Sequence, residues 1–335
     1  MEVSFFPARL GAPEAHTVQK TTRQHVFQDA GGVMTRPGIL AVFILCGSSW
    51  TGLGQQTLPP PAYETRASVV KIEVHLTNVD DHERVPDQLR RCFEESDFCV
   101  IGTGVRINSE GDVLTAAHVA QDTSAVGEAL RNAGIDSQVL IAGSARNAEY
   151  VRGDAERTGG VAAASMKAID TEHDLAVLKT QETGDFAAID DRTRSNRGRE
   201  AKLDLQRPDP GEAIFGFGFP EYSPGLIATT GAITLAVGST NLPEAQKSGN
   251  TQLVPVYRAG LEIDPGNSGA AVFRASDGAL RGIVCEISEK PSIVATIVPA
   301  SEIAKVLSKY AVRWDAAPDG PPKVKTRAGF RKHLW

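Results

Sequence analysis

The chain of 335 residues is longer than one small domain requires, and its 23% charged and 41% apolar residues are the mix of a soluble globular protein. Its formal net charge is −6 with no long basic run, which excludes the electrostatic footprint of a nucleic-acid-binding protein. The seven histidines and four cysteines form no cluster with zinc-ligand spacing, so we expect neither a metal nor a cofactor.

An apolar run near the N-terminus predicts export. Residues 38–46 read GILAVFILC, too short to cross a bilayer, with Arg36 before the run and small residues after it. A positive flank, a short apolar core and a small-residue cleavage site are typical of a secretory signal peptide. A start at Met34 would give this signal normal proportions, and we assign residues 1–54 to an N-terminal extension and signal peptide, which predicts a periplasmic or secreted protein. A buried strand and a lipid anchor on Cys46 are the alternatives.

Short strands follow a proline-rich stretch. Residues 55–66 contain three consecutive prolines and are predicted to be an extended linker. Between residues 67 and 312 β-rich segments alternate with Gly/Pro turns: SVVKIEVHL, CVIGTGVRI, DVLTAAHV, SQVLIAG, DLAVLKT, EAIFGFG, LIATTGAITLAV, TQLVPVYRAG, GAAVF, LRGIVCEIS and SIVATIVP. Such a series predicts an all-β barrel or sandwich.

Two segments have helical patterns. DTSAVGEALRNAG predicts a short helix that ends at Gly134. PASEIAKVLSKY has apolar residues at i, i+3, i+4 and i+7 and offers Ser301 as an N-cap. Residues 313–335 are proline-rich and then basic, and we predict a mobile tail there.

The cysteines fit an exported protein. Cys92 and Cys99 bracket the polar loop CFEESDFC, and in an oxidising compartment they would close it with a disulfide worth roughly 2–3 kcal/mol. The alternative is a pair of free thiols. Cys285 lies in the apolar strand pattern RGIVCEIS and is predicted to be a buried free thiol.

The segment EIDPGNSGAAVF holds Ser268 between glycines, in front of a strand. A serine hydroxyl is a weak nucleophile and needs a base, which in turn needs an orienting group. In the segment VLTAAHVA, His118 ends the predicted apolar strand, and Asp174 precedes the predicted strand LAVL. Each has a structural alternative: a Gly-rich turn for Ser268, a core histidine for His118 and a loop cap for Asp174. His173 would point away from Asp174, because neighbours on an extended chain face opposite sides.

Four segments together resemble the landmarks of trypsin-like serine proteases, most closely the bacterial HtrA/Do-type branch. They are TGVRINSEGDVLTAAHV, DLAVLKT, FGFPEYSPGLIATTGAIT and DPGNSGAAVF, in the order His, Asp, Ser. The resemblance covers roughly Ala67–Tyr310. It implies two six-stranded antiparallel β-barrels with a C-terminal helix, and a trypsin-like protease domain over residues 67–312.

The resemblance also assigns roles. It makes Ser268 the nucleophile, His118 the general base and Asp174 the residue that orients the imidazole, with the N–H groups of Gly266 and Ser268 as the oxyanion hole. Ala270 departs from the family's second glycine after the serine. The segment from Asp80 to Phe98 departs from the usual loop. No segment resembling a PDZ domain follows the final helix, so we expect a protease domain alone.

Specificity is predicted from two carboxylates. In trypsin-like enzymes the residue six before the nucleophile lies at the base of the primary specificity pocket, and that residue is Glu262. Glu286 is expected to border the same pocket, so a basic substrate side chain would be favoured. Alternatively Glu262 faces solvent or pairs with Arg258 or Arg281, and HtrA-type pockets favour small apolar residues.

The resemblance thus implies an exported serine endopeptidase that acts on proteins or peptides through an acyl-enzyme. The alternative is a binding module with a protease fold, or a latent form whose oxyanion loop is ordered by a partner. Membrane contact is expected only through the signal peptide or a lipid anchor on Cys46. The substrate, the oligomeric state and the start codon stay open.

Overall fold

The computed structural model describes residues 58–94, 96–143, 161–181, 200–220, 225–264, 266–288 and 294–318, all of which belong to one compact unit, Gly54–Trp335. The predicted signal peptide and most of the predicted tail therefore lie outside the described residues.

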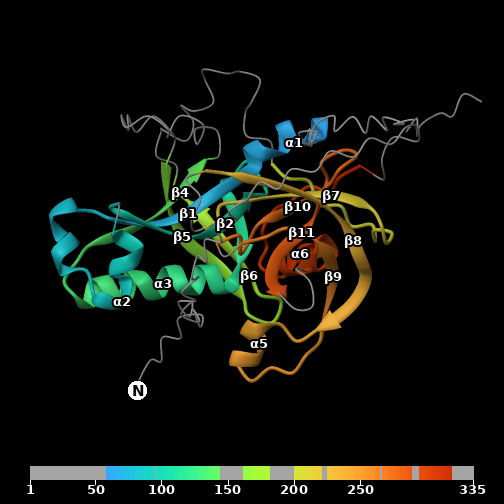
Figure 1. Cartoon of the computed structure of the whole chain (residues 1–335). Helices are drawn as coiled ribbons and strands as arrows, with labels where there is room; N and C mark the ends of the chain where they lie inside the picture. The colour runs from blue at the N-terminus through green and yellow to red at the C-terminus, as the bar shows by residue number, and fades with distance from the viewer. Residues whose placement is uncertain are drawn as a thin grey trace, which may run out of the picture. The chain divides into compact units, whose positions relative to one another are not determined.

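Two closed β-barrels make up this unit (Figure 1). Their strand orders are equivalent, β1-β2-β3-β6-β5-β4 and β7-β8-β9-β12-β11-β10, and every described pairing between two of these strands is antiparallel. The first barrel contains β1 Val69–Leu76, β2 Phe98–Arg106, β3 Asp112–Ala116, β4 Ser137–Gly143, β5 Val161–Asp170 and β6 Leu175–Thr180. The second contains β7 Ala213–Gly218, β8 Ile227–Thr240, β9 Val254–Gly260, β10 Ala271–Arg274, β11 Leu280–Ser288 and β12 Val294–Pro299. The predicted fold class is confirmed.

The helices depart from the sequence prediction in their starting points. They are α1 Pro60–Thr65, α2 Asp87–Arg90, α3 Ala117–Asn132, α5 Pro243–Lys247 and α6 Ala300–Lys309, with 3-10 turns η1 Arg66–Ser68, η2 Val79–Arg84 and η3 Arg91–Phe93. Helix α3 starts directly after β3, earlier than predicted. Helix α6 starts after Pro299, so Ser301 lies inside it and is not its N-cap.

The two ends of the described chain also differ from prediction. The linker expected to be extended over residues 55–66 is helical from Pro60, where a proline in the first turn needs no hydrogen-bond acceptor. At the other end, Leu203 accepts from the N–H of Ala317 and donates to Asp315 O. The first residues of the predicted tail are therefore fixed to the second barrel.

The core holds the two barrels together. One apolar cluster joins buried side chains of both, including Leu114 and Val119 of the first barrel with Phe215 and Phe273 of the second. A separate small cluster packs the segment between β1 and β2 against α3 through Val85, Phe93 and Leu130, among others. The predicted Cys92–Cys99 disulfide closes this segment, with the two Cα atoms 5.2 Å apart. Cys285 is a buried free thiol, as predicted.

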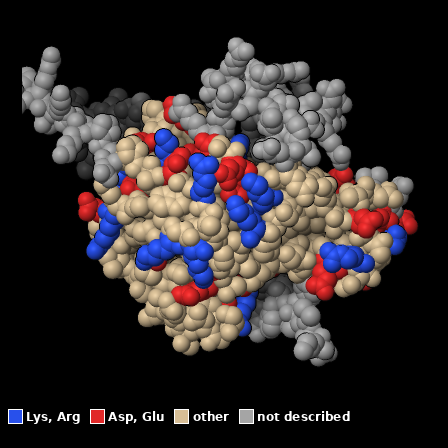
Figure 2. Space-filling model, turned by 180° about the vertical axis from the view of Figure 1, so that it is seen from behind, with Lys and Arg blue, Asp and Glu red and all other residues tan. Residues whose placement is uncertain are grey.

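Charges of both signs are interleaved on the face drawn in Figure 2. The exposed pair Arg90–Asp87 lies three residues apart within a helix, as do exposed Lys305 and buried Glu302. Among the described helices, none is long and apolar enough to cross a membrane.

Candidate active site

His118 and Asp174 meet where β3 and β6 run side by side. The two strands pair up to Ala116 opposite Leu175. His118 follows Ala116 by two residues and Asp174 directly precedes Leu175, so both lie at the same end of this strand pair. His118 Nδ1 lies 2.9 Å from Asp174 Oδ2 and 3.1 Å from Oδ1. Because a carboxylate accepts hydrogen bonds, this contact assigns the proton to Nδ1 and leaves Nε2 as an acceptor.

Asp174 also caps the helix that carries His118. The main-chain N–H of His118 donates to Asp174 Oδ1 (3.0 Å), and the N–H of Ala117 donates to Asp174 O (3.0 Å). These are two of the donors that a helix leaves unsatisfied at its first turn, and a negative charge is favourable there. Since the cap comes from the turn before β6 and not from the local sequence, α3 begins at Ala117 without a capping side chain before it.

The electrostatic surroundings raise the pKa of His118 above its ordinary value of 6.5. Burial alone would lower this pKa, but the hydrogen bond to Asp174 and its negative charge outweigh burial, with further support from the charges of Asp122 and Glu244. Asp122 lies one turn along α3 from His118, and Glu244 belongs to α5 of the second barrel. The imidazolium form is thus stabilised, as a proton-accepting base requires.

Ser268 lies in the loop before β10, and the first barrel holds this loop in place. The N–H of Thr103, in β2, donates to Ser268 O (2.9 Å). The Thr103 hydroxyl accepts from the N–H of Phe219 (2.9 Å) and donates to Gly266 O (3.4 Å). On the other side, the N–H of Gly269 donates to Val284 O (2.9 Å) in β11.

Cys285 connects this loop to the main chain of Asp174. It follows Val284 in β11, and its Sγ donates to Asp174 O at 3.6 Å. The loop with Ser268 and the turn with Asp174 therefore both contact β11. Sequence reasoning missed Thr103 as a site residue, because a threonine in a strand pattern carries no signal of such a role.

The loop geometry suits an anion. Asn267, Gly269 and Ala270 use their N–H groups within the protein, on Asp264 O, Val284 O and Asn267 O. Among the described residues, no group accepts from the N–H of Gly266 or Ser268. Gly266 has a φ of +92°, a left-handed conformation that side chains disfavour. Two donors are thus left for a charge that develops beside Ser268.

The two carboxylates predicted to select the substrate have different surroundings. Glu262 is exposed, and Glu286 is partly buried with its Oε2 accepting from Thr296 Oγ1 (3.4 Å). Arg258 donates to the same Thr296 hydroxyl (2.7 Å), whereas Arg281 pairs with Glu212 and Asp204. In the described contacts, neither arginine pairs with Glu262.

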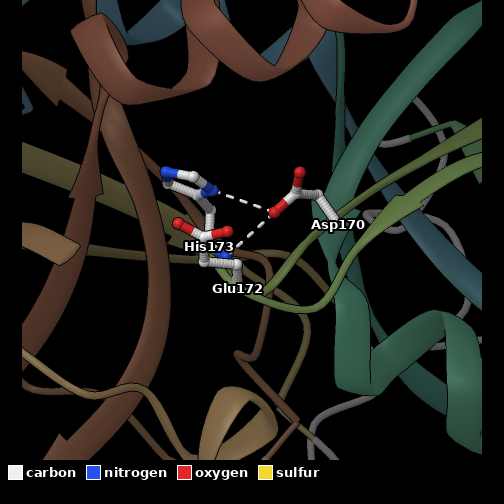
Figure 3. Close-up of side chains that lie close together, drawn as sticks. All are labelled: Asp170, Glu172 and His173. Carbon is white, nitrogen blue, oxygen red and sulfur yellow. Dashed lines mark hydrogen bonds and ion pairs between the residues drawn. The ribbon is translucent and has the colours of Figure 1, made fainter. Parts of the chain in front are cut away.

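A group that could hold a metal lies beside Asp174. Asp170, Glu172 and His173 bring one ligand atom each within 4.8 Å of one another (Figure 3). The Asp170 carboxylate already accepts from His173 Nδ1 (2.8 Å) and from Lys309 Nζ (2.8 Å), so a metal ion would have to displace both. We therefore interpret the group as an ion-pair network and not as a metal centre.

Comparisons with known proteins agree with this fold. A family model described as a trypsin-like peptidase domain matches residues 102–283, more than half of the chain. The HtrA-type protease AlgW, solved with a decapeptide, has a TM-score of 0.50 and 22% identity, over 75% of this chain and 66% of the AlgW chain. The active form of the Rv3671c protease from M. tuberculosis has a TM-score of 0.50 and 19% identity, over 78% of this chain and 91% of that one. These identities support a shared fold. The search of curated proteins found no match.

Proposed function

The chain belongs to the trypsin-like peptidase family, and from this premise we propose that it is an exported serine endopeptidase with His118, Asp174 and Ser268 as its catalytic triad. The observation that carries the proposal is the oriented imidazole. Asp174 binds Nδ1 of His118, and the loop with Ser268 is fastened to the same barrel through Thr103.

The reaction follows from these positions. Ser268 Oγ attacks the peptide carbonyl while His118 Nε2 accepts the hydroxyl proton, and the negative oxygen forms beside the N–H groups of Gly266 and Ser268. His118 then gives the proton to the departing amine, which leaves an acyl-enzyme. Water repeats the sequence, with His118 as base and Ser268 as leaving group. Asp174 stabilises the imidazolium in both halves.

A fluorophosphonate probe tests the assignment, because it phosphonylates only an activated serine. We expect wild-type protein to be labelled and Ser268→Ala to be unlabelled. The matched control is Ser239→Ala, which removes an exposed hydroxyl from β8 and should leave labelling unchanged. A folded wild-type protein that takes up no label would favour the binding module, or the latent form if a partner restores labelling.

Substrate choice is the finer part of the proposal. We assign Glu262 and Glu286 to a primary pocket that favours basic side chains. Exposure leaves the Glu262 carboxylate available to a substrate cation, whereas Glu286 shares Thr296 with Arg258. Cleavage of a peptide library should show a basic preference that weakens in Glu262→Ala. Dominant cleavage after aliphatic residues, unchanged in the variant, would contradict the assignment.

Export is supported by the signal-like N-terminus and by the Cys92–Cys99 disulfide, since disulfides persist in oxidising compartments. N-terminal sequencing of the mature protein should find cleavage near residue 54. An intact start in a protein recovered from the cytoplasm would contradict export.

A further inference from the structure

We propose that His173 is a positioning residue for the catalytic pair, acting through the turn that carries Asp174. The inference rests on the proposed function, because the reaction defines what must be positioned. His173 itself does not contact His118 in the described contacts. Its effect would pass through the peptide that it shares with Asp174.

The turn itself is short and conformationally demanding. Strand β5 ends at Asp170 and β6 begins at Leu175, and these two residues pair, so four residues make the whole connection. Asp174, the last of them, is fully buried and has a φ of +50°, in the left-handed region that few residues other than glycine adopt. Such a conformation persists only where the surroundings impose it. The turn therefore needs bracing to keep the Asp174 carboxylate on His118.

His173 braces the turn from within. Its main-chain N–H and its ring Nδ1 both bind Asp170 Oδ1, at 3.1 and 2.8 Å, and Figure 3 shows both groups directed at that carboxylate. One carboxylate oxygen thus fixes both the main-chain N–H of His173, the residue before Asp174, and the ring of the same residue. Because the His173 side chain is mostly buried, solvent does not readily replace either contact.

Helix α6 braces the turn from outside. The other ring nitrogen of His173, Nε2, lies 3.8 Å from Glu302 Oε2, and Lys309 Nζ donates to Asp170 Oδ2 at 2.8 Å. Tyr310, which follows the helix, donates its hydroxyl to Ile169 O at 2.8 Å. The imidazole is thus the part of the turn that touches both Asp170 and the helix.

Charged groups of both signs surround the turn. Asp170 faces His173 and Lys309. His173 faces Asp170, Glu172 and Glu302, and Glu302 is also paired with Lys305 on the solvent side. Burial alone would raise the pKa of Asp170, but the hydrogen bonds from His173 and Lys309 hold that pKa well below its ordinary value. The carboxylate that fixes the turn is therefore ionised at neutral pH.

Removal of the imidazole should let the turn relax. A misplacement of about 1 Å at a catalytic group costs about 100-fold in rate, so we expect His173→Ala to lower kcat about 10- to 100-fold with KM little changed. Weaker contact between Asp174 and His118 should also move the acid limb of kcat/KM to lower pH, because that contact raises the His118 pKa.

Two conservative variants separate the contacts. In His173→Asn, the amide nitrogen can take the place of Nδ1 and keep the bond to Asp170, whereas His173→Gln reaches the position of Nε2 and loses that bond. We expect Asn to restore most of kcat and of the wild-type pH profile, and Gln to restore less. Lys305→Gln, which alters the same Glu302 from its solvent side, should behave as wild type.

The decisive measurement does not require activity. NMR titration of the His118 imidazole should give a lower pKa in His173→Ala than in wild type, with recovery in His173→Asn. An unchanged His118 pKa, or a fall in kcat without any shift of the acid limb, would overturn the positioning role and leave a purely structural one. If wild-type protein takes no fluorophosphonate label, the proposed function fails, and the NMR titration still decides this inference.

Discussion

Asp174→Asn removes one charge at almost constant shape, and the structure predicts its effect. The carboxylate accepts from the main-chain N–H of His118 on Oδ1 and from Nδ1 on both oxygens. An amide has a single oxygen. If that oxygen keeps the main-chain N–H, the amide NH₂ faces Nδ1, and the imidazole proton must move to Nε2.

A proton on Nε2 removes the acceptor that Ser268 needs. Loss of the correct tautomer costs about 10⁴ in turnover in a triad of this type, equivalent to about 5 kcal/mol of transition-state stabilisation. The opposite amide orientation does no better, because its NH₂ would then face the main-chain N–H of His118. Both orientations predict a loss of the same order.

The assay compares the second-order rate of fluorophosphonate labelling, and kcat for the best peptide from a library, in wild type and Asp174→Asn. Asp87→Asn is the matched control, since the Asp87 side chain is 91% exposed. The thermal midpoint of Asp174→Asn should stay close to that of wild type, because the amide fills the same volume. A loss of less than about 10-fold in a folded variant would refute the assigned geometry, since it falls far short of the 10⁴ expected.

Further predictions concern the base, the nucleophile loop and the disulfide. Because a neutral His118 is required and its pKa is raised, kcat/KM should increase with pH through a midpoint above 6.5; a lower midpoint would contradict this. Gly269→Ala should abolish labelling, since Gly269 has a φ of +80° and an added Cβ would collide with the main chain of β2. Gly211→Ala, at a φ of +86° with open space around it, should lower the free energy of unfolding in urea by only about 1 kcal/mol. Equal effects of the two variants would refute the steric argument. Replacement of Cys92 and Cys99 by alanine should lower the free energy of unfolding by about 2–3 kcal/mol, and reduced wild type should match the variant; unchanged stability would count against this.

Much of the fold could be predicted because local sequence patterns indicate it. Alternation and turn residues mark the strands, and the order of His118, Asp174 and Ser268 has few other interpretations once their segments are aligned with the family. The start of α3 could not be predicted in this way. VLTAAHVA is compatible with strand and helix alike, and the cap that decides between them, Asp174, lies 56 residues further along the chain.

The supporting residues of the site could not be predicted either, because their contacts also join residues far apart in the chain. Thr103 acts on Ser268 across 165 positions, and His173 meets Glu302 across 129, so no spacing rule connects them. An extended chain predicts that His173 points away from Asp174. The chain turns at this point, and the histidine faces Asp170 and helix α6.

The anchoring of the Ser268 loop on Thr103 has a consequence for the timing of activity. During synthesis the first barrel is complete before Ser268 has been translated, and a second barrel folded alone would lack the hydrogen bond from β2 that holds this loop. On the proposed assignment, nucleophile, base and anion site come together only when the two barrels dock. The proposed proteolytic activity would then be the last property that the chain acquires, and a partly folded molecule would lack it.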